Sequence, residues 1–250
     1  MTINKALESF KNQNYEEALK LFLEINANGD ETPNIFNNIG LCHLSLENYE
    51  DAEKFFLKAL SLDDKIPQVY LNLADLYYRQ EEILKTIEIL QNGVYKLPDN
   101  VAIRHYLARV YIDDSRYDIA IDQLEAVIDL SPKNYDAYWD LGRTYFLLGV
   151  WDMAISNYEE VLAYVDTNPL IYYNIALAYA ANDEVDKAIS NHLKAIAQDD
   201  KFAHSYKELG TLFLSRGDKE DAIEYFEEYI ALPIPEDEKE EIQALLKRIS

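Results

Sequence analysis

The sequence is poor in the residues that cross-link or break a helical chain. Cys42 is the only cysteine among 250 residues, so no disulfide can form within the chain. Seven glycines and seven prolines are too few for a disordered or β-rich architecture. No apolar stretch approaches the ~20 residues of a membrane-spanning helix, and the N-terminus shows no apolar signal region. These absences predict a cytoplasmic protein without membrane insertion.

Basic residues are also scarce. The chain has 23 Lys and Arg against 46 Asp and Glu, which gives a net charge of −23. Proteins that bind nucleic acids neutralise phosphates with clustered Lys and Arg, so this charge predicts no nucleic-acid partner. The sequence also lacks a glycine-rich phosphate loop, metal-binding Cys and His spacings and a nucleophile elbow. We therefore predict no enzymatic activity, no cofactor and no metal site.

Repetition is what the sequence has in abundance. A small residue recurs every 34 positions, and it is alanine in all but one case: Ala18, Ala52, Thr86, Ala120, Ala154, Ala188 and Ala222. A larger residue follows each of these by four positions: Phe22, Phe56, Leu90, Leu124, Tyr158, His192 and Phe226. Such a period indicates a stack of identical supersecondary units. The small side chains should be buried where paired helices approach closely.

Each unit contains two helical stretches. In the unit that starts at residue 135, the first stretch carries an aromatic, an aliphatic, a small residue and a ring: Tyr138, Leu141, Gly142 and Tyr145. Spacings of three and four residues keep these side chains on one helical face. The second stretch of the same unit opens with Trp151, and its small and large residues follow in turn. The pattern predicts an antiparallel helix pair in every unit.

This pattern resembles the tetratricopeptide repeat, over essentially the whole chain. The resemblance implies an all-α, right-handed α-solenoid of seven repeats and a C-terminal capping helix. The repeats are expected to occupy residues 1–235, with starts near residues 1, 33, 67, 101, 135, 169 and 203. The segment 236–250 follows Pro233 and Pro235 and is expected to form the capping helix. Its apolar stripe consists of Ile242, Leu245, Leu246 and Ile249.

In tetratricopeptide proteins the first helix of each pair lines the concave surface. Its second, fifth, sixth, ninth, twelfth and thirteenth positions point into the groove. Four of the seven sixth positions in this chain are asparagine: Asn4, Asn38, Asn72 and Asn174. An asparagine side chain both donates and accepts hydrogen bonds, so it can pair with the backbone of an extended peptide. The resemblance therefore implies a peptide-binding groove.

The middle of this groove differs from the rest of the acidic chain. Arg109 and Arg143 share the ninth position of adjacent repeats and are expected to be neighbours, with Arg79 nearby. The flanking residues on the first helices are His105, Tyr106, Trp139, Asp140 and Tyr173. Arginine binds carboxylates and phosphates through two parallel hydrogen bonds and stacks on rings. The alternative is that the arginines stabilise the stack by pairing with Asp140 and with Asp75 or Asp113, although exposed ion pairs contribute little.

We therefore predict a non-catalytic, monomeric scaffold that binds a peptide segment of a partner protein, and we expect that segment to carry an acidic group. Two alternatives remain open at this point: a module that senses a peptide or small anion, and a structural subunit that self-assembles through its ends. Self-assembly requires exposed apolar end faces. The predicted groove residues are Asn38, Asn72, Arg79, His105, Tyr106, Arg109, Trp139, Asp140, Arg143, Tyr173 and Asn174.

Overall fold

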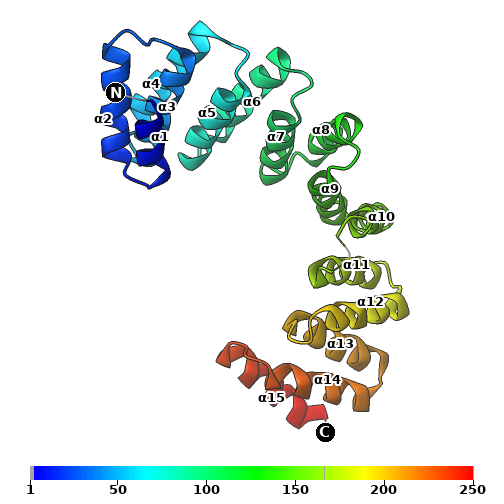
Figure 1. Cartoon of the computed structure of the whole chain (residues 1–250). Helices are drawn as coiled ribbons and strands as arrows, with labels where there is room; N and C mark the ends of the chain where they lie inside the picture. The colour runs from blue at the N-terminus through cyan, green and yellow to red at the C-terminus, as the bar shows by residue number, and fades with distance from the viewer. Residues whose placement is uncertain (1–2, 166, 250) are drawn as a thin grey trace. The chain divides into compact units, whose positions relative to one another are not determined.

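A computed structural model describes residues 3–165 and 167–249 of the chain. Within these residues the structure contains fifteen α-helices and no β-strand (Figure 1). Consecutive helices pack in pairs, which confirms the predicted all-α repeat fold with a final single helix. The chain divides into two compact units, Met1–Pro132 and Lys133–Ser250.

The first unit holds four helix pairs. Its helices are α1 (Ile3–Lys11), α2 (Tyr15–Ala27), α3 (Pro33–Ser45), α4 (Tyr49–Leu62), α5 (Pro67–Arg79), α6 (Ile83–Lys96), α7 (Val101–Asp113) and α8 (Tyr117–Leu130). Within this unit each helix from α1 to α7 packs on the next one along the chain, and α5 also contacts α3 and α7. The first helices of the second, third and fourth pairs therefore lie against one another, as a repeat stack requires.

The second unit holds three pairs and the capping helix. Its helices are α9 (Tyr135–Leu147), α10 (Trp151–Leu162), α11 (Pro169–Ala181), α12 (Val185–Gln198), α13 (Ala203–Arg216), α14 (Lys219–Ala231) and α15 (Glu236–Ile249). Helix α15 begins directly after Pro235 and packs on α14. Ile242 is buried, and Leu245, Leu246 and Ile249 pack against the same core cluster. The predicted apolar stripe is therefore the contact face of the cap.

Proline and asparagine set the starts of several first helices. Pro33, Pro67 and Pro169 occupy the first helical position, where the missing N–H costs no hydrogen bond. The side chains of Asn100 and Asn134 accept hydrogen bonds from backbone N–H groups three residues later. Each asparagine thereby satisfies one of the amide groups that a helix start leaves unpaired.

The 34-residue series of small side chains forms the contacts between paired helices. All six alanines of the series have no exposed surface, among them Ala120 and Ala154, so their predicted burial is confirmed. Thr86 is also fully buried, and its hydroxyl donates to the carbonyl oxygen of Glu82 at 3.1 Å. Threonine therefore fits this position because its polar group is satisfied by its own helix.

A left-handed residue occupies the turn inside every helix pair. These residues recur with the same period: Gln13, Glu47, Glu81, Ser115, Gly149, Asp183 and Gly217. Their φ angles range from 58° at Ser115 to 91° at Gly217. This backbone conformation crowds the Cβ of an ordinary residue, and only glycine adopts it without that cost.

Glycine should therefore stabilise the turns that lack it. We expect Glu47→Gly and Glu81→Gly each to raise the free energy of unfolding by roughly 0.5–1 kcal/mol. This net gain is the relief of backbone strain minus the entropy that glycine adds to the unfolded chain. Chemical denaturation followed by circular dichroism measures the change. Glu88→Gly, at an exposed glutamate in the middle of α6, is the matched control and should lower the free energy of unfolding by about 1 kcal/mol. A loss at both turns would contradict the strain argument.

Candidate binding surface on the first helices

The candidate residues lie on the first helices of the pairs, in each of the two units. We call the helix faces that carry them the first-helix surface. The first unit contributes Asn38, Asn72, Arg79, His105, Tyr106 and Arg109 from α3, α5 and α7. The second unit contributes Trp139, Asp140, Arg143, Tyr173 and Asn174 from α9 and α11. Arg109 and Arg143 thus belong to different units, and their proximity stays a prediction.

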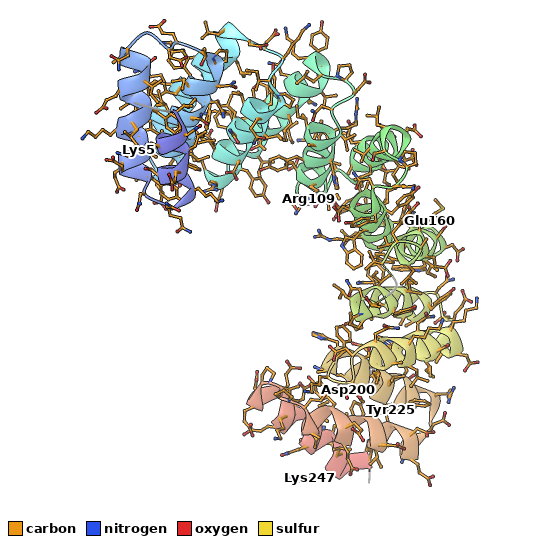
Figure 2. The ribbon with its side chains drawn as sticks, viewed as in Figure 1. Lys5, Arg109, Glu160, Asp200, Tyr225 and Lys247 are labelled. Carbon is orange, nitrogen blue, oxygen red and sulfur yellow. The ribbon has the colours of Figure 1, made fainter. Side chains whose placement is uncertain are left out.

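Helices α5 and α7 bring together the charged part of the surface in the first unit. A guanidinium nitrogen of Arg79 lies 2.9 Å from a carboxylate oxygen of Asp75, and both side chains are substantially exposed. Arg109 is exposed on α7, and Figure 2 shows its side chain extending from that helix. The first unit therefore presents two arginines on this surface, of which Arg79 has an acidic neighbour one helical turn away.

Tyr106 lies within electrostatic reach of these charges. It is half-buried, and burial together with the Asp75 carboxylate raises the pKa of its hydroxyl to about 12. The positive charges of Arg109 and Arg79 oppose that rise. Both guanidinium groups thus lie close enough to act on one phenol. The result is a phenol that stays neutral, and available as a hydrogen-bond donor, across the physiological pH range.

Tyr78 completes this cluster, and the sequence prediction did not include it. Its ring meets that of Tyr106 edge to face, with the ring centroids 6.4 Å apart. Its hydroxyl donates to the Asp113 carboxylate at 2.8 Å, and this hydrogen bond raises the pKa of Tyr78. Tyr78 occupies the twelfth position of its helix, which the resemblance assigns to the groove, so the sequence register contained a signal for it. Asp75 and Asp113, which the alternative interpretation offered as partners of Arg109 and Arg143, are thus engaged by Arg79 and Tyr78.

Asn72 serves a different purpose from the one predicted. Its side chain is only 7% exposed, and its amide nitrogen donates to the Asn37 side-chain oxygen at 2.8 Å. The Asn72 side-chain oxygen accepts from the Gln68 amide at 3.0 Å. Both ends of the amide are therefore occupied within the protein, and Asn72 ties α5 to α3. We remove Asn72 from the candidate surface for this reason.

The other candidates of the first unit are more accessible. Asn38 and His105 are half-buried on α3 and α7. Neither side chain is enclosed by the core, so both can contribute to a surface contact. In the first unit the candidate surface thus consists of one arginine-aromatic cluster with Asn38 and His105 beside it.

Aromatic packing dominates the surface of the second unit. The rings of Trp139 and Tyr158 are 5.3 Å apart between centroids, and Tyr158 is 2% exposed. Arg143, one turn after Trp139, is exposed and lies close enough to oppose the burial-driven rise in the pKa of Tyr158. Asp140 is 8% exposed. Of the three α9 candidates, Trp139 and Arg143 are therefore accessible, whereas Asp140 is largely buried.

Tyr173 forms the centre of a second aromatic group. Its ring lies 5.6 Å from those of His192 and Phe202 and 5.7 Å from that of His204. Burial raises the pKa of Tyr173, and the Glu208 carboxylate adds to the rise. The Asn174 amide donates to the carbonyl oxygen of Leu170 at 2.8 Å, and its side chain remains partly exposed.

The described residues contain no cluster of three or more His, Cys, Asp or Glu side chains that could hold a metal ion. In the same part of the chain, no helix is both long and apolar enough to cross a membrane. The chemical groups that the first-helix surface presents are therefore guanidinium, phenol, indole and amide. Such groups suit recognition of a carboxylate, a phosphate or a peptide segment.

Comparison with known families agrees with the repeat pattern. Models of the family described as tetratricopeptide repeat match residues 33–65 and 173–237, and a model described as TPR repeat matches residues 108–149 and 142–183. These matches together cover more than half of the chain. The chain therefore belongs to the tetratricopeptide repeat proteins. It has no match among the curated proteins.

Several solved structures share the fold. The C-terminal part of a TPR repeat-containing protein from Cytophaga hutchinsonii is 20% identical, with a TM-score of 0.80 over 93% of this chain and 95% of that one. A tetratricopeptide repeat protein from Parabacteroides merdae is 19% identical, with a TM-score of 0.64 over 99% and 96%. YrrB, described as a TPR protein with an unusual peptide-binding site, is 20% identical, with a TM-score of 0.62 over 74% and 95%. At these identities the likeness shows the fold alone.

Proposed function

We propose that this protein is a non-catalytic scaffold that binds a peptide segment of a partner, and that the segment carries an acidic group. Tetratricopeptide repeat proteins generally mediate protein–protein interactions. The observation that carries the proposal is the cluster of Arg79, Tyr106 and Arg109 on α5 and α7. Both guanidinium groups act electrostatically on one phenol, in a protein of net charge −23.

The arginines of this cluster can exchange partners at little cost. The Arg79–Asp75 pair leaves the Arg79 side chain 51% exposed, and exposed pairs contribute at most ~1 kcal/mol. A carboxylate or phosphate of a partner can therefore compete for the guanidinium. In the second unit, Trp139 and Tyr173 supply partly exposed rings next to Arg143 and Asn174. Arginine and aromatic residues of this kind frequently dominate the energy of an interface.

The test is partner capture with matched baits. The unmodified chain and the double variant Arg109→Ala with Arg143→Ala are used to capture proteins from a lysate, which mass spectrometry identifies. We expect at least one partner to be retained by the unmodified chain and lost by the double variant. Raising the salt concentration should weaken the same complex, because part of the contact is electrostatic. Helical content and the thermal melt should not change.

Arg116→Ala is the control bait. Arg116 is an exposed arginine that pairs with Asp114 in a turn, away from the first-helix positions, so its loss should leave capture unchanged. The proposal is wrong if the double variant captures its partner normally while a charge reversal on a second helix, such as Glu125→Lys on α8, abolishes capture.

Self-assembly remains a second candidate because of one observation. Helices α1 and α2 expose apolar side chains, with Ile3, Leu7 and Leu23 each between 38% and 44% accessible. A second copy could cover these side chains. Light scattering separates the two functions: a monomer mass at micromolar concentration supports the scaffold and contradicts self-assembly.

A further inference from the structure

A cleft in the second unit lies outside the arginine cluster. Helices α9, α10 and α11, with Val165 and Asn168 of the connection between α10 and α11, line an open cleft of about 390 Å³. Val161 and Ile171, which are 4% and 1% exposed, lie at its apolar base. Tyr135, Trp139 and Leu170 also line it, and Tyr135 and Leu170 are 45% and 40% exposed. The cleft is thus an open recess with an apolar base and two aromatic rings.

The two rings make this recess more than an apolar hollow. The face of an indole or phenol ring attracts a cation, and tryptophan does so most strongly. Trp139 is held in place by its contact with the Tyr158 ring, whose centroid lies 5.3 Å away. A side chain that enters the recess therefore meets a fixed indole without first having to order it.

The charge of the recess favours the same kind of occupant. Asp136 lines the cleft and is exposed, and none of the described lining residues is Lys or Arg. The net charge of −23 gives the whole protein a field that attracts cations. A purely apolar occupant would cover the Asp136 carboxylate without replacing its hydration, which is unfavourable. A cationic occupant with an apolar stem satisfies the base, the rings and the carboxylate together.

We propose that this cleft binds a lysine or arginine side chain of the partner segment. The inference deepens the proposed scaffold function, because it adds a basic residue to a segment that already carries an acidic group. The stem of the basic side chain lies over Val161 and Ile171, its cationic head lies at the Tyr135 and Trp139 rings, and Asp136 pairs with the head.

The test uses two small probes on the intact chain. N-acetyl-arginine methylamide carries the cation, and N-acetyl-norleucine methylamide offers a similar apolar stem without the charge. In nitrogen-15 NMR titrations we expect the indole signal of Trp139 and the amide signals of Asn168 and Leu170 to shift saturably with the arginine probe. The arginine probe should bind at least about fivefold more tightly than the norleucine probe.

Two substitutions show whether the carboxylate causes the preference. Asp136→Asn should reduce the affinity for the arginine probe about fivefold and leave the norleucine probe unaffected. Asp118→Asn is the matched control, because Asp118 is also an exposed aspartate at the second position of its helix, α8. It should leave both probes unaffected. Trp139→Leu should weaken binding of the arginine probe, although Val161 and Ile171 still form the apolar base.

Equal binding of the two probes, or an unchanged preference in Asp136→Asn, would overturn the inference. Shifts without saturation would also overturn it. These titrations need no partner, so their failure leaves the scaffold proposal standing on its capture experiment. Conversely, loss of the scaffold proposal would not alter the expected response of Trp139 to the arginine probe.

Discussion

Gly142→Ala should lower the free energy of unfolding by about 1–2 kcal/mol, although alanine is the better helix former. A Cβ at residue 142 would lie 2.7 Å from two carbons of the Tyr158 ring. That ring is 2% exposed and packs against Trp139, so it has little room to move. Overpacking of this kind costs about 1–3 kcal/mol, which exceeds the gain of about 1 kcal/mol in helix propensity.

The same contact recurs in other repeats and explains which small residue each one uses. Gly40 faces Phe56 and Gly210 faces Phe226, with ring carbons at 2.7 and 2.6 Å from the position of a Cβ. Where the partner position holds a different side chain, the small residue is alanine: Ala74 with Leu90, Ala108 with Leu124 and Ala176 with His192. The first repeat is the exception: Ala6 occupies the small-residue position, although its partner position holds Phe22.

A double variant gives the sharper result, because the sign of the effect should reverse. Tyr158→Leu reproduces the partner found at residues 90 and 124 and makes room for a methyl group. In that background we expect Gly142→Ala to stabilise the protein by up to about 1 kcal/mol. Denaturant titrations of the four proteins measure the coupling between the two sites. Ala108→Gly is the control, because the partner of Ala108 is Leu124 and not an aromatic ring; it should lower the free energy of unfolding by about 1 kcal/mol. If the effects of the substitutions at residues 142 and 158 simply add, the explanation is wrong.

His192 should make the stability of the protein depend on pH between about 6.5 and 4. The side chain has no exposed surface, and burial lowers its pKa to about 4. Its Nδ1 lies 3.3 Å from the Ser205 hydroxyl, whereas its Nε2 is buried without a hydrogen-bond partner among the described residues. The unfolded chain has a histidine pKa of about 6.5. Below about pH 6.5 the imidazole of His192 binds a proton in the unfolded state but stays neutral in the folded state. The free energy of unfolding therefore falls as pH falls, by up to about 3 kcal/mol.

His192→Leu should remove this contribution. Leucine occupies the equivalent positions 90 and 124, so it fits the site, and it has no group to protonate. We expect the free energy of unfolding of the variant to change less than that of the unmodified chain between pH 6.5 and 4.5. The difference between the two proteins cancels the titration of the many carboxylates. His204→Leu, at an exposed histidine in the same unit, is the control and should retain the original slope. Parallel slopes for all three proteins would exclude His192 as the cause.

Much of the fold could be predicted because the repeat pattern is reinforced seven times. The position of Ala154 alone says little, but five more alanines and Thr86 at the same period leave one register that buries all of them. The helix starts at Pro67 and Pro169 and the capping helix after Pro235 follow from local chemistry that needs no tertiary contact. The left-handed backbone conformation of Glu47 and Glu81 could not be predicted from the sequence, because glutamate does not favour that conformation.

The candidate surface was less predictable, because register places a side chain on a face but does not assign its partners. The sequence by itself determined that Arg79, Tyr106 and Arg109 lie on first helices, at positions that the tetratricopeptide resemblance assigns to the groove. Only the tertiary structure decided that Asn72 would bond to Asn37, and that Tyr78 would take Asp113. These hydrogen bonds join residues 35 positions apart, so they depend on the distance and angle between repeats. A side-chain hydrogen bond is lost when its donor–acceptor distance grows by more than a few tenths of an ångström, whereas hydrophobic packing is non-directional and tolerates such shifts. The sequence therefore predicts the fold better than it predicts the contacts of the candidate surface.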